Sequence, residues 1–92
     1  ILREGCTVSQ YTFLCTGTHD YSRLDLPHRV APIEIGKHAW VTAQCYIGPG
    51  VTVGEGAVVG VRSSVFTDVE PWMIVAGTPA KVIKKREVSD ER

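Results

Sequence analysis

Hydrophobic positions recur every six residues through the second half of the chain. Stepping by six meets a β-branched aliphatic residue each time, at Ile35, Val41, Ile47, Val53, Val59 and Val65. Four residues after each of these stands a small or β-branched residue, at Ala39, Cys45, Val51, Ala57, Ser63 and Val69. An α-helix has a period of 3.6 residues and cannot keep every sixth residue on one face. The pattern predicts a solenoid of very short strands, with both sets of residues pointing into one core.

Glycine completes this repeat, because it directly follows the aliphatic residue at Gly36, Gly48, Gly54 and Gly60. We expect these glycines to relieve crowding at the turns and to supply positive φ where it is needed. Stacked coils would pair their backbones about 4.8 Å apart, like the strands of any sheet.

The same register runs through the beginning of the chain and is then interrupted. Leu2 with Cys6, Val8 with Thr12, and Leu14 with Thr18 fit the repeat, whereas residues 20–32 do not. The sequence therefore predicts a β-solenoid over residues 1–70 with a loop inserted at 20–32, and a C-terminal tail over 71–92. Long loops in compact repeat proteins are usually functional or disordered. Within the tail, residues 81–92 are expected to form a short strand or a helix.

Composition narrows the class of protein. The chain has 92 residues, enough for one small domain, and its ten basic residues balance ten acidic ones, which favours neither nucleic acid nor an anionic membrane as partner. Its three cysteines match no zinc-binding spacing, and an odd number suits reduced thiols. We find no apolar run long enough for a membrane span and no signal peptide. We expect a cytoplasmic protein without a metal site.

Several motifs resemble one enzyme family over nearly the whole chain. They are Cys15–Tyr21 (CTGTHDY), Ala31–Gly36, Ala39–Val41, Ile47–Gly60 and Val75–Ile83. These segments resemble the hexapeptide-repeat O-acetyltransferases of the galactoside, maltose, nodulation-factor and colanic-acid types. The colanic-acid type is the nearest, because of the His-Asp-Tyr motif and the Pro-Trp pair at residues 71 and 72.

The resemblance implies an all-β fold, a left-handed parallel β-helix. It also implies a homotrimer with its active sites between neighbouring subunits. The implied reaction transfers an acetyl group from acetyl-coenzyme A to a hydroxyl of a sugar or polysaccharide precursor. The acceptor itself stays open, and no metal takes part.

His19 occupies the position of the family's catalytic histidine, where the repeat meets the loop. An alcohol is a poor nucleophile at neutral pH, and imidazole can take its proton during attack. Asp20 and Tyr21 would line the acceptor side. Asp20 either orients His19, binds a sugar hydroxyl, or caps a turn, and the sequence does not separate these roles.

Other matching positions form the expected coenzyme A site. Trp40 would form a wall of the channel near the pantetheine arm, or else pack at a trimer interface. Ala43 and Val61 match positions whose backbone groups bind the pantetheine amides, although the family usually has alanine in place of Val61.

Basic residues near the end of the chain match positions that the family uses near the phosphates. Lys81 and Lys84 would supply these charges, unless they are only solvated surface. Thr67 stands where the family often has a lysine, so one phosphate contact is either lost or taken over by Arg62.

Other functions are compatible with the same fold. The γ-type carbonic anhydrases hold zinc with three histidines, but His19, His28 and His38 lack the coil-related spacing, and His28 lies in the loop. Serine and xenobiotic acetyltransferases are nearer alternatives. An inactive or purely structural β-helix is the alternative outside enzymes.

Overall fold

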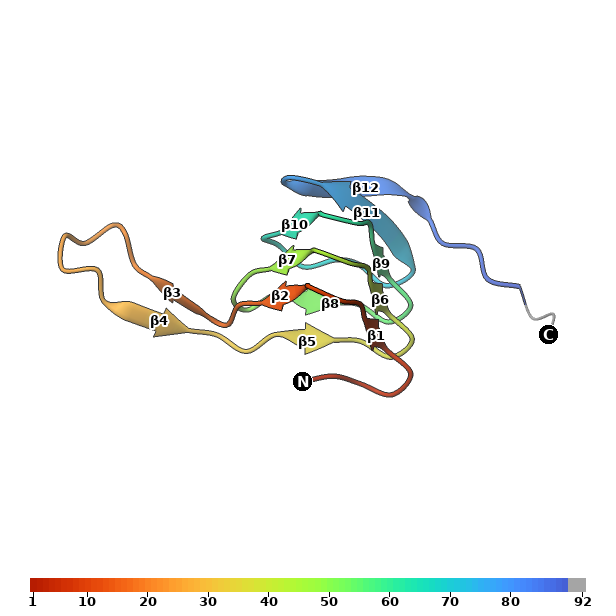
Figure 1. Ribbon diagram of the computed structural model, residues 1–92, viewed down its shortest axis with the longest axis horizontal. Helices are drawn as coiled ribbons and strands as arrows, with labels where there is room; N and C mark the ends of the chain where they lie inside the picture. Colours follow the sequence, from red (N-terminus) through yellow and green to blue (C-terminus); the bar gives the residue numbers. More distant parts are fainter. Residues whose placement is uncertain (90–92) are drawn as a thin grey trace.

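The computed structural model describes residues 1–89, and every regular element within this range is a β-strand. Most strands contain only two residues, and they alternate with tight corners (Figure 1). The strands are β1 (Thr7–Val8), β2 (Phe13–Leu14), β3 (Gly17–His19), β4 (His28–Val30), β5 (Glu34–Ile35), β6 (Trp40–Val41), β7 (Tyr46–Ile47), β8 (Thr52–Val53), β9 (Val58–Val59), β10 (Ser64–Val65), β11 (Met73–Gly77) and β12 (Ala80–Lys85). No helix in residues 1–89 is long and apolar enough to cross a membrane.

Parallel pairing stacks successive coils on three faces. β5 pairs with β8, β6 with β9, and β7 with β10. In each of these pairs a residue lies opposite the residue 18 positions later, such as Val41 opposite Val59. One coil therefore consists of three hexapeptide repeats, one for each face.

The predicted core is confirmed. The six aliphatic residues of the repeat are at most 1% exposed, and their partners four residues later are at most 6% exposed. Each fully buried Val or Ile side chain contributes about 1.5–3 kcal/mol relative to exposure. The stack is thus stabilised by the same contact made again in each coil.

The glycines of the repeat act through their small size. A Cβ atom on Gly54 would lie 2.6 Å from the backbone nitrogen of Pro71, and one on Gly36 would lie 2.7 Å from that of Glu55. The expectation that these glycines supply positive φ is wrong. Left-handed φ values occur instead three residues after the aliphatic residue of the repeat, at Gly5, Tyr11, His38, Gln44, Gly50, Gly56 and Arg62, and three residues after Val69, at Trp72. The corners of the coil thus impose this conformation on residues of many types.

The first coil contains a hairpin that leaves the stack. β3 and β4 pair antiparallel, with Gly17 opposite Val30 and His19 opposite His28, and they project away from the coils (Figure 1). We call residues 17–30 the hairpin arm. The sequence register was wrong here, because Thr18 is exposed on the arm and lies outside the core. The arm starts earlier than the loop expected at 20–32, since β3 satisfies its backbone hydrogen bonds with β4.

The C-terminal segment continues the largest sheet. β11 pairs parallel with β9 and antiparallel with β12, which gives the strand order β1-β6-β9-β11-β12. The boundary expected at residue 70 therefore does not coincide with a break in strand pairing. The strand expected within 81–92 is present as far as Lys85, and residues 90–92 lie outside the described residues.

Candidate functional site

His19 stands at the end of β3, where the hairpin arm turns. The backbone N–H of Asp20 donates to the carbonyl of Pro27, and that of Ala31 donates to Thr16, at 2.9 Å in both cases. These bonds make His19 and His28, which lie between them, a non-hydrogen-bonded pair, the type whose side chains approach more closely. The two imidazole rings have their centroids 5.4 Å apart. Strand register, which the sequence did not reveal, therefore places two histidines side by side.

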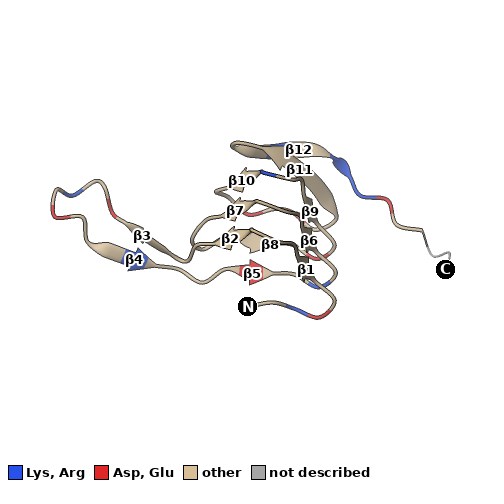
Figure 2. Ribbon diagram, in the orientation of Figure 1, with Lys and Arg blue, Asp and Glu red and all other residues tan. Residues whose placement is uncertain are grey.

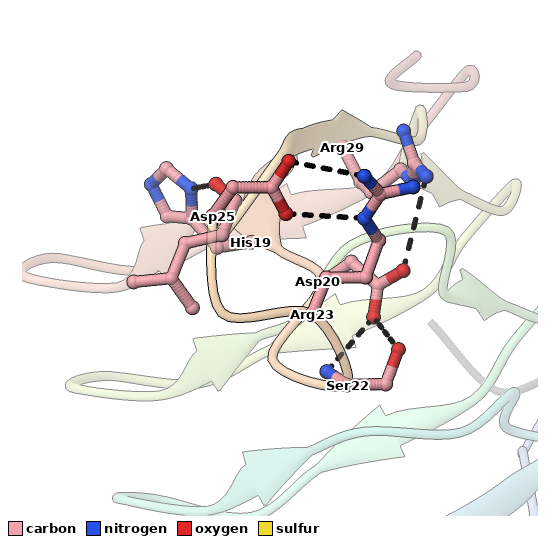
Figure 3. Close-up of polar contacts among 7 residues, drawn as sticks. His19, Asp20, Ser22, Arg23, Asp25 and Arg29 are labelled. Carbon is pink, nitrogen blue, oxygen red and sulfur yellow. Dashed lines mark hydrogen bonds and ion pairs between the residues drawn. The ribbon is translucent and has the colours of Figure 1, made fainter.

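A backbone carbonyl orients the imidazole of His19. Nδ1 of His19 lies 2.7 Å from the carbonyl oxygen of Leu26, a residue held at the left-handed φ of 48° (Figure 3). A carbonyl can only accept a hydrogen bond, so Nδ1 of the neutral ring carries the proton. Nε2 is then left with its lone pair, as a general base requires.

Asp20 is bound within its own turn. Its Oδ1 accepts hydrogen bonds from the backbone N–H of Ser22 and from the Ser22 hydroxyl, and its Oδ2 lies 3.8 Å from the guanidinium of Arg29 (Figure 3). The hydrogen bonds from the Ser22 hydroxyl and then from its amide lower the pKa of Asp20. Of the three roles that the sequence left open, these contacts favour the turn cap, because the ring partner of His19 is Leu26.

The remaining arm residues are open to solvent. Tyr21 is 92% exposed, and Arg23 forms an ion pair with Asp25 across the loop, at 3.1 Å. The ring of His28 lies over Gly17, where an added Cβ would come within 2.9 Å of its Nε2. Both Tyr21 and His28 are therefore accessible to a molecule that approaches His19.

A second cluster lies on the corner that follows β6 and β9. Trp40, Ala43 and Val61, three of the residues expected to bind coenzyme A, line one open groove of about 430 Å³ together with Ser9, Gln10 and Thr42. Nε1 of Trp40 donates to the Ser9 hydroxyl at 2.9 Å, which holds the indole against the first coil. Ser9 and Gln10 carry no motif in the sequence, although their position one coil before Thr42 and Ala43 could have indicated them.

The other residues expected to bind coenzyme A lie outside this groove. Thr67 and Lys81 line a separate hollow of about 360 Å³ at the C-terminal end of the stack, which also contains Asp68 and Glu70. Lys84 lines neither hollow. It is in register with Trp40, because Lys84 lies opposite Ile74, Ile74 opposite Val58, and Val58 opposite Trp40. Arg62 hydrogen-bonds the side chain of Gln44 at 2.9 Å.

His19, on the hairpin arm, and the groove lined by Trp40 lie on opposite sides of the stacked coils. Figure 1 shows the hairpin arm on one side of the stack and the sheet that contains β6 and β9 on the other. Figure 2 shows acidic and basic residues on the arm, and basic residues along β12. Within residues 1–89 no three His, Cys, Asp or Glu side chains are grouped as metal ligands.

The chain is similar in sequence to known acetyltransferases. No family model matches it. It is 42% identical over 79 residues to the colanic acid biosynthesis acetyltransferase WcaF of Escherichia coli (strain K12), covering 86% of this chain and 43% of the relative. It is 44% identical over 70 residues to a chloramphenicol acetyltransferase of Klebsiella aerogenes, covering 76% of this chain and 33% of that protein. The chain thus spans less than half the length of the curated relatives it matches.

Solved structures share the fold. A galactoside acetyltransferase in complex with coenzyme A superposes with a TM-score of 0.87 at 28% identity, over 94% of this chain and 44% of the other. The N-acyltransferase AntD from Bacillus cereus, in complex with dTDP and 3-hydroxybutyryl-CoA, superposes with a TM-score of 0.84 at 26% identity, over 94% of this chain and 51% of that chain.

Proposed function

Because this chain is a homologue of the hexapeptide-repeat acetyltransferases, we propose that it is the catalytic β-helix of an acetyl-coenzyme A-dependent O-acetyltransferase. The acceptor is a hydroxyl of a sugar or polysaccharide precursor, and the coils form a left-handed parallel β-helix. The single observation that carries the proposal is the bond from Nδ1 of His19 to the Leu26 carbonyl, which leaves Nε2 as a base.

In the proposed reaction the acceptor oxygen attacks the thioester carbonyl while Nε2 of His19 takes its proton. The tetrahedral intermediate then collapses, the carbon–sulfur bond breaks, and the coenzyme A sulfur leaves with the proton from the imidazolium. The products are the acetyl ester and free coenzyme A, and His19 is neutral again. General-base catalysis of this kind contributes typically about 10²–10⁴-fold.

The donor is proposed to lie in the groove lined by Trp40, Ala43 and Val61, with its phosphates toward Lys81 and Lys84. Two features support this placement. The groove is open along the corner of the stacked coils, and the row from Trp40 through Val58 and Ile74 ends at Lys84. Lys81 lies on β12 with Lys84, opposite Ala76 of β11, and adds a second positive charge at this edge. Ammonium groups suit phosphate as point charges.

We further propose a homotrimer in which one subunit supplies His19 and its neighbour supplies the groove. The arm and the groove lie on opposite sides of one chain, so that chain alone does not bring base and donor together (Figure 1). The arm also exposes Tyr21, Leu24 and Val30 to solvent at 92%, 103% and 66%. Contact with a second copy would bury this apolar surface.

Subunit mixing tests the shared site. His19→Ala and Trp40→Ala each remove one half of it, so each variant alone should have low activity. When the two variants are unfolded together and refolded as a mixture, interfaces with both wild-type residues form again, and part of the activity should return. No recovery in mixtures that light scattering shows to be mixed oligomers would contradict the shared site.

The reaction class is tested by coenzyme A release with a panel of acceptors. We expect turnover with sugar hydroxyls to give acetyl esters, and no amide product from amino sugars. The similarity to chloramphenicol acetyltransferases favours a xenobiotic hydroxyl as the second candidate acceptor, so chloramphenicol belongs in the panel. Turnover with amines alone would contradict O-acetylation, and no coenzyme A release with any acceptor would favour the structural alternative.

A further inference from the structure

The position of Lys84 depends on an irregularity in β12. Val75 lies opposite Val82, but the next pair along the ladder joins Ile74 to Lys84, so Ile83 is an extra residue on this strand. Such a bulge changes which residues share a face of the sheet. Moving the bulge one residue toward Lys85 would put Ile83 opposite Ile74 and make Lys84 the extra residue, outside the row that begins at Trp40.

Little else in the sheet fixes the position of the bulge. β12 is the last strand of its sheet, with β11 as its only strand neighbour in the described residues. The turn after Gly77 and the partly buried Ala80 fix the start of the strand. Around the bulge, however, Val82, Ile83 and Lys84 are all exposed, so no buried side chain there distinguishes one alignment from the next. Registers without such a distinction are prone to slip.

Arg86 fastens the strand just beyond the bulge. Its backbone N–H donates to the Trp72 carbonyl at 2.7 Å, which extends the ladder past Lys85. Its Nη1 donates to the carbonyls of Gly56, at 2.9 Å, and His38, at 3.1 Å, and its guanidinium lies 6.0 Å from the centre of the Trp72 ring. The guanidinium thus binds three successive coils at one corner.

The corner itself presents this binding surface. His38, Gly56 and Trp72 all have left-handed φ values, between 59° and 68°, and stack one above another. The Trp72 ring fills the space over Gly56, where an added Cβ would meet it at 2.3 Å. Hydrogen bonds from a charged donor are stronger than neutral ones, and Nη1 carries two N–H groups, so it can donate to both carbonyls.

We propose that Arg86 is a positioning residue for donor binding: by tying the end of β12 to this corner, it holds the bulge at Ile83 and keeps Lys84 on the face of Trp40. The proposal rests on the proposed function through the phosphate contact of Lys84. Arg86 itself touches neither the groove nor His19.

Hydrogen exchange and donor kinetics on the full chain test the proposal together. Arg86→Ala should speed amide exchange in residues 80–85, leave exchange in β5 to β10 unchanged, and raise the Michaelis constant for acetyl-coenzyme A by about fivefold, the scale of one exposed ion pair. Turnover at saturating donor should stay the same, and Arg86→Lys should recover part of the loss. Lys85→Ala removes the same charge next to Arg86 and should change neither measurement.

The outcomes separate this proposal from the proposed function. Unchanged exchange in residues 80–85 of Arg86→Ala would overturn it, and so would an equal rise in the Michaelis constant for Lys85→Ala. Lys84→Ala alone reports on the phosphate contact, whatever Arg86 does. If Lys84→Ala raises the Michaelis constant and adding Arg86→Ala raises it no further, the two residues act as one unit, as proposed.

Discussion

The coils and the hairpin arm make opposite use of their side chains. In the coils, Val41 and Val59 are 0% exposed, and the same contact recurs every 18 residues. In the arm, Leu24 is 103% exposed, and the polar side chains bond mainly to their own turn. The coils therefore hold most of the folding free energy, whereas the arm carries the proposed base.

This separation means that activity and stability should respond to different mutations. Residues that act in chemistry are often placed on loops that a rigid scaffold positions.

Removing the proposed base should have the largest effect. His19→Ala should lower turnover by about 10²–10⁴-fold, because the acceptor hydroxyl loses its proton acceptor. The free energy of unfolding, measured by thermal denaturation, should stay within about 0.5 kcal/mol of wild type, since the His19 side chain is exposed. His28→Ala is the matched control on the opposite strand. If His28→Ala loses activity and His19→Ala keeps it, the wrong histidine has been assigned.

Removing a core side chain should produce the reverse result. Ile47 is 0% exposed, so Ile47→Ala should lower the free energy of unfolding by about 2–5 kcal/mol. Leu24→Ala, on the arm, should change stability by less than about 0.5 kcal/mol. Urea titration of both variants measures the contrast, and a similar loss in the two would show that the arm packs as firmly as the coils.

Gly54 should be required for stability because no larger residue fits between the stacked coils. Gly54→Ala places a Cβ 2.6 Å from the backbone nitrogen of Pro71, and we expect a loss of about 1–3 kcal/mol from this overpacking. Gly48→Ala is the control, because its Cβ would lie 3.3 Å from the nearest atom. Equal losses in the two variants would point to backbone conformation as the cause.

Acid should loosen the arm before the coils. The pKa of Asp20 is lowered by its hydrogen bonds to Ser22, so the ionised form stabilises the turn above the ordinary aspartate pKa of about 3.9. This contribution is lost as the pH falls through the lower pKa of the folded arm. The Ser22 amide should report that transition by NMR at a pH where core amides are still unchanged. Asp20→Asn should abolish it.

The repeat predicted the coils well because its information is local. The aliphatic residues from Ile35 to Val65 stand six positions apart, and each stacks on its equivalent in the next coil. One short pattern therefore specifies both the core and the strand pairing. Thr18 shows where the pattern misleads. It fits the hexapeptide template, yet β3 pairs with β4 and leaves the stack. The six-residue pattern describes each segment by itself and carries no information on whether another strand, here β4, pairs with it outside the stack.

The candidate site was predicted unevenly. His19, Trp40, Ala43 and Val61 were chosen from motifs, and the structure brings the last three into one groove. Leu26 could not be predicted, because a carbonyl oxygen has no residue signature, and the same holds for Arg86, whose partners are also backbone carbonyls.

The sequence alone therefore determined which residues of the coils from Ile35 to Val69 are buried, how long each repeat is, and which histidine meets the motif. Tertiary structure decided the hydrogen-bond partner of His19, the hydrogen bonds of Asp20 within its own turn, and the separation of Thr67 and Lys81 from the groove of Trp40. The reason is physical. Burial follows from the side chain itself and repeats with the chain, whereas a hydrogen bond to a carbonyl depends on where the folded backbone places that oxygen.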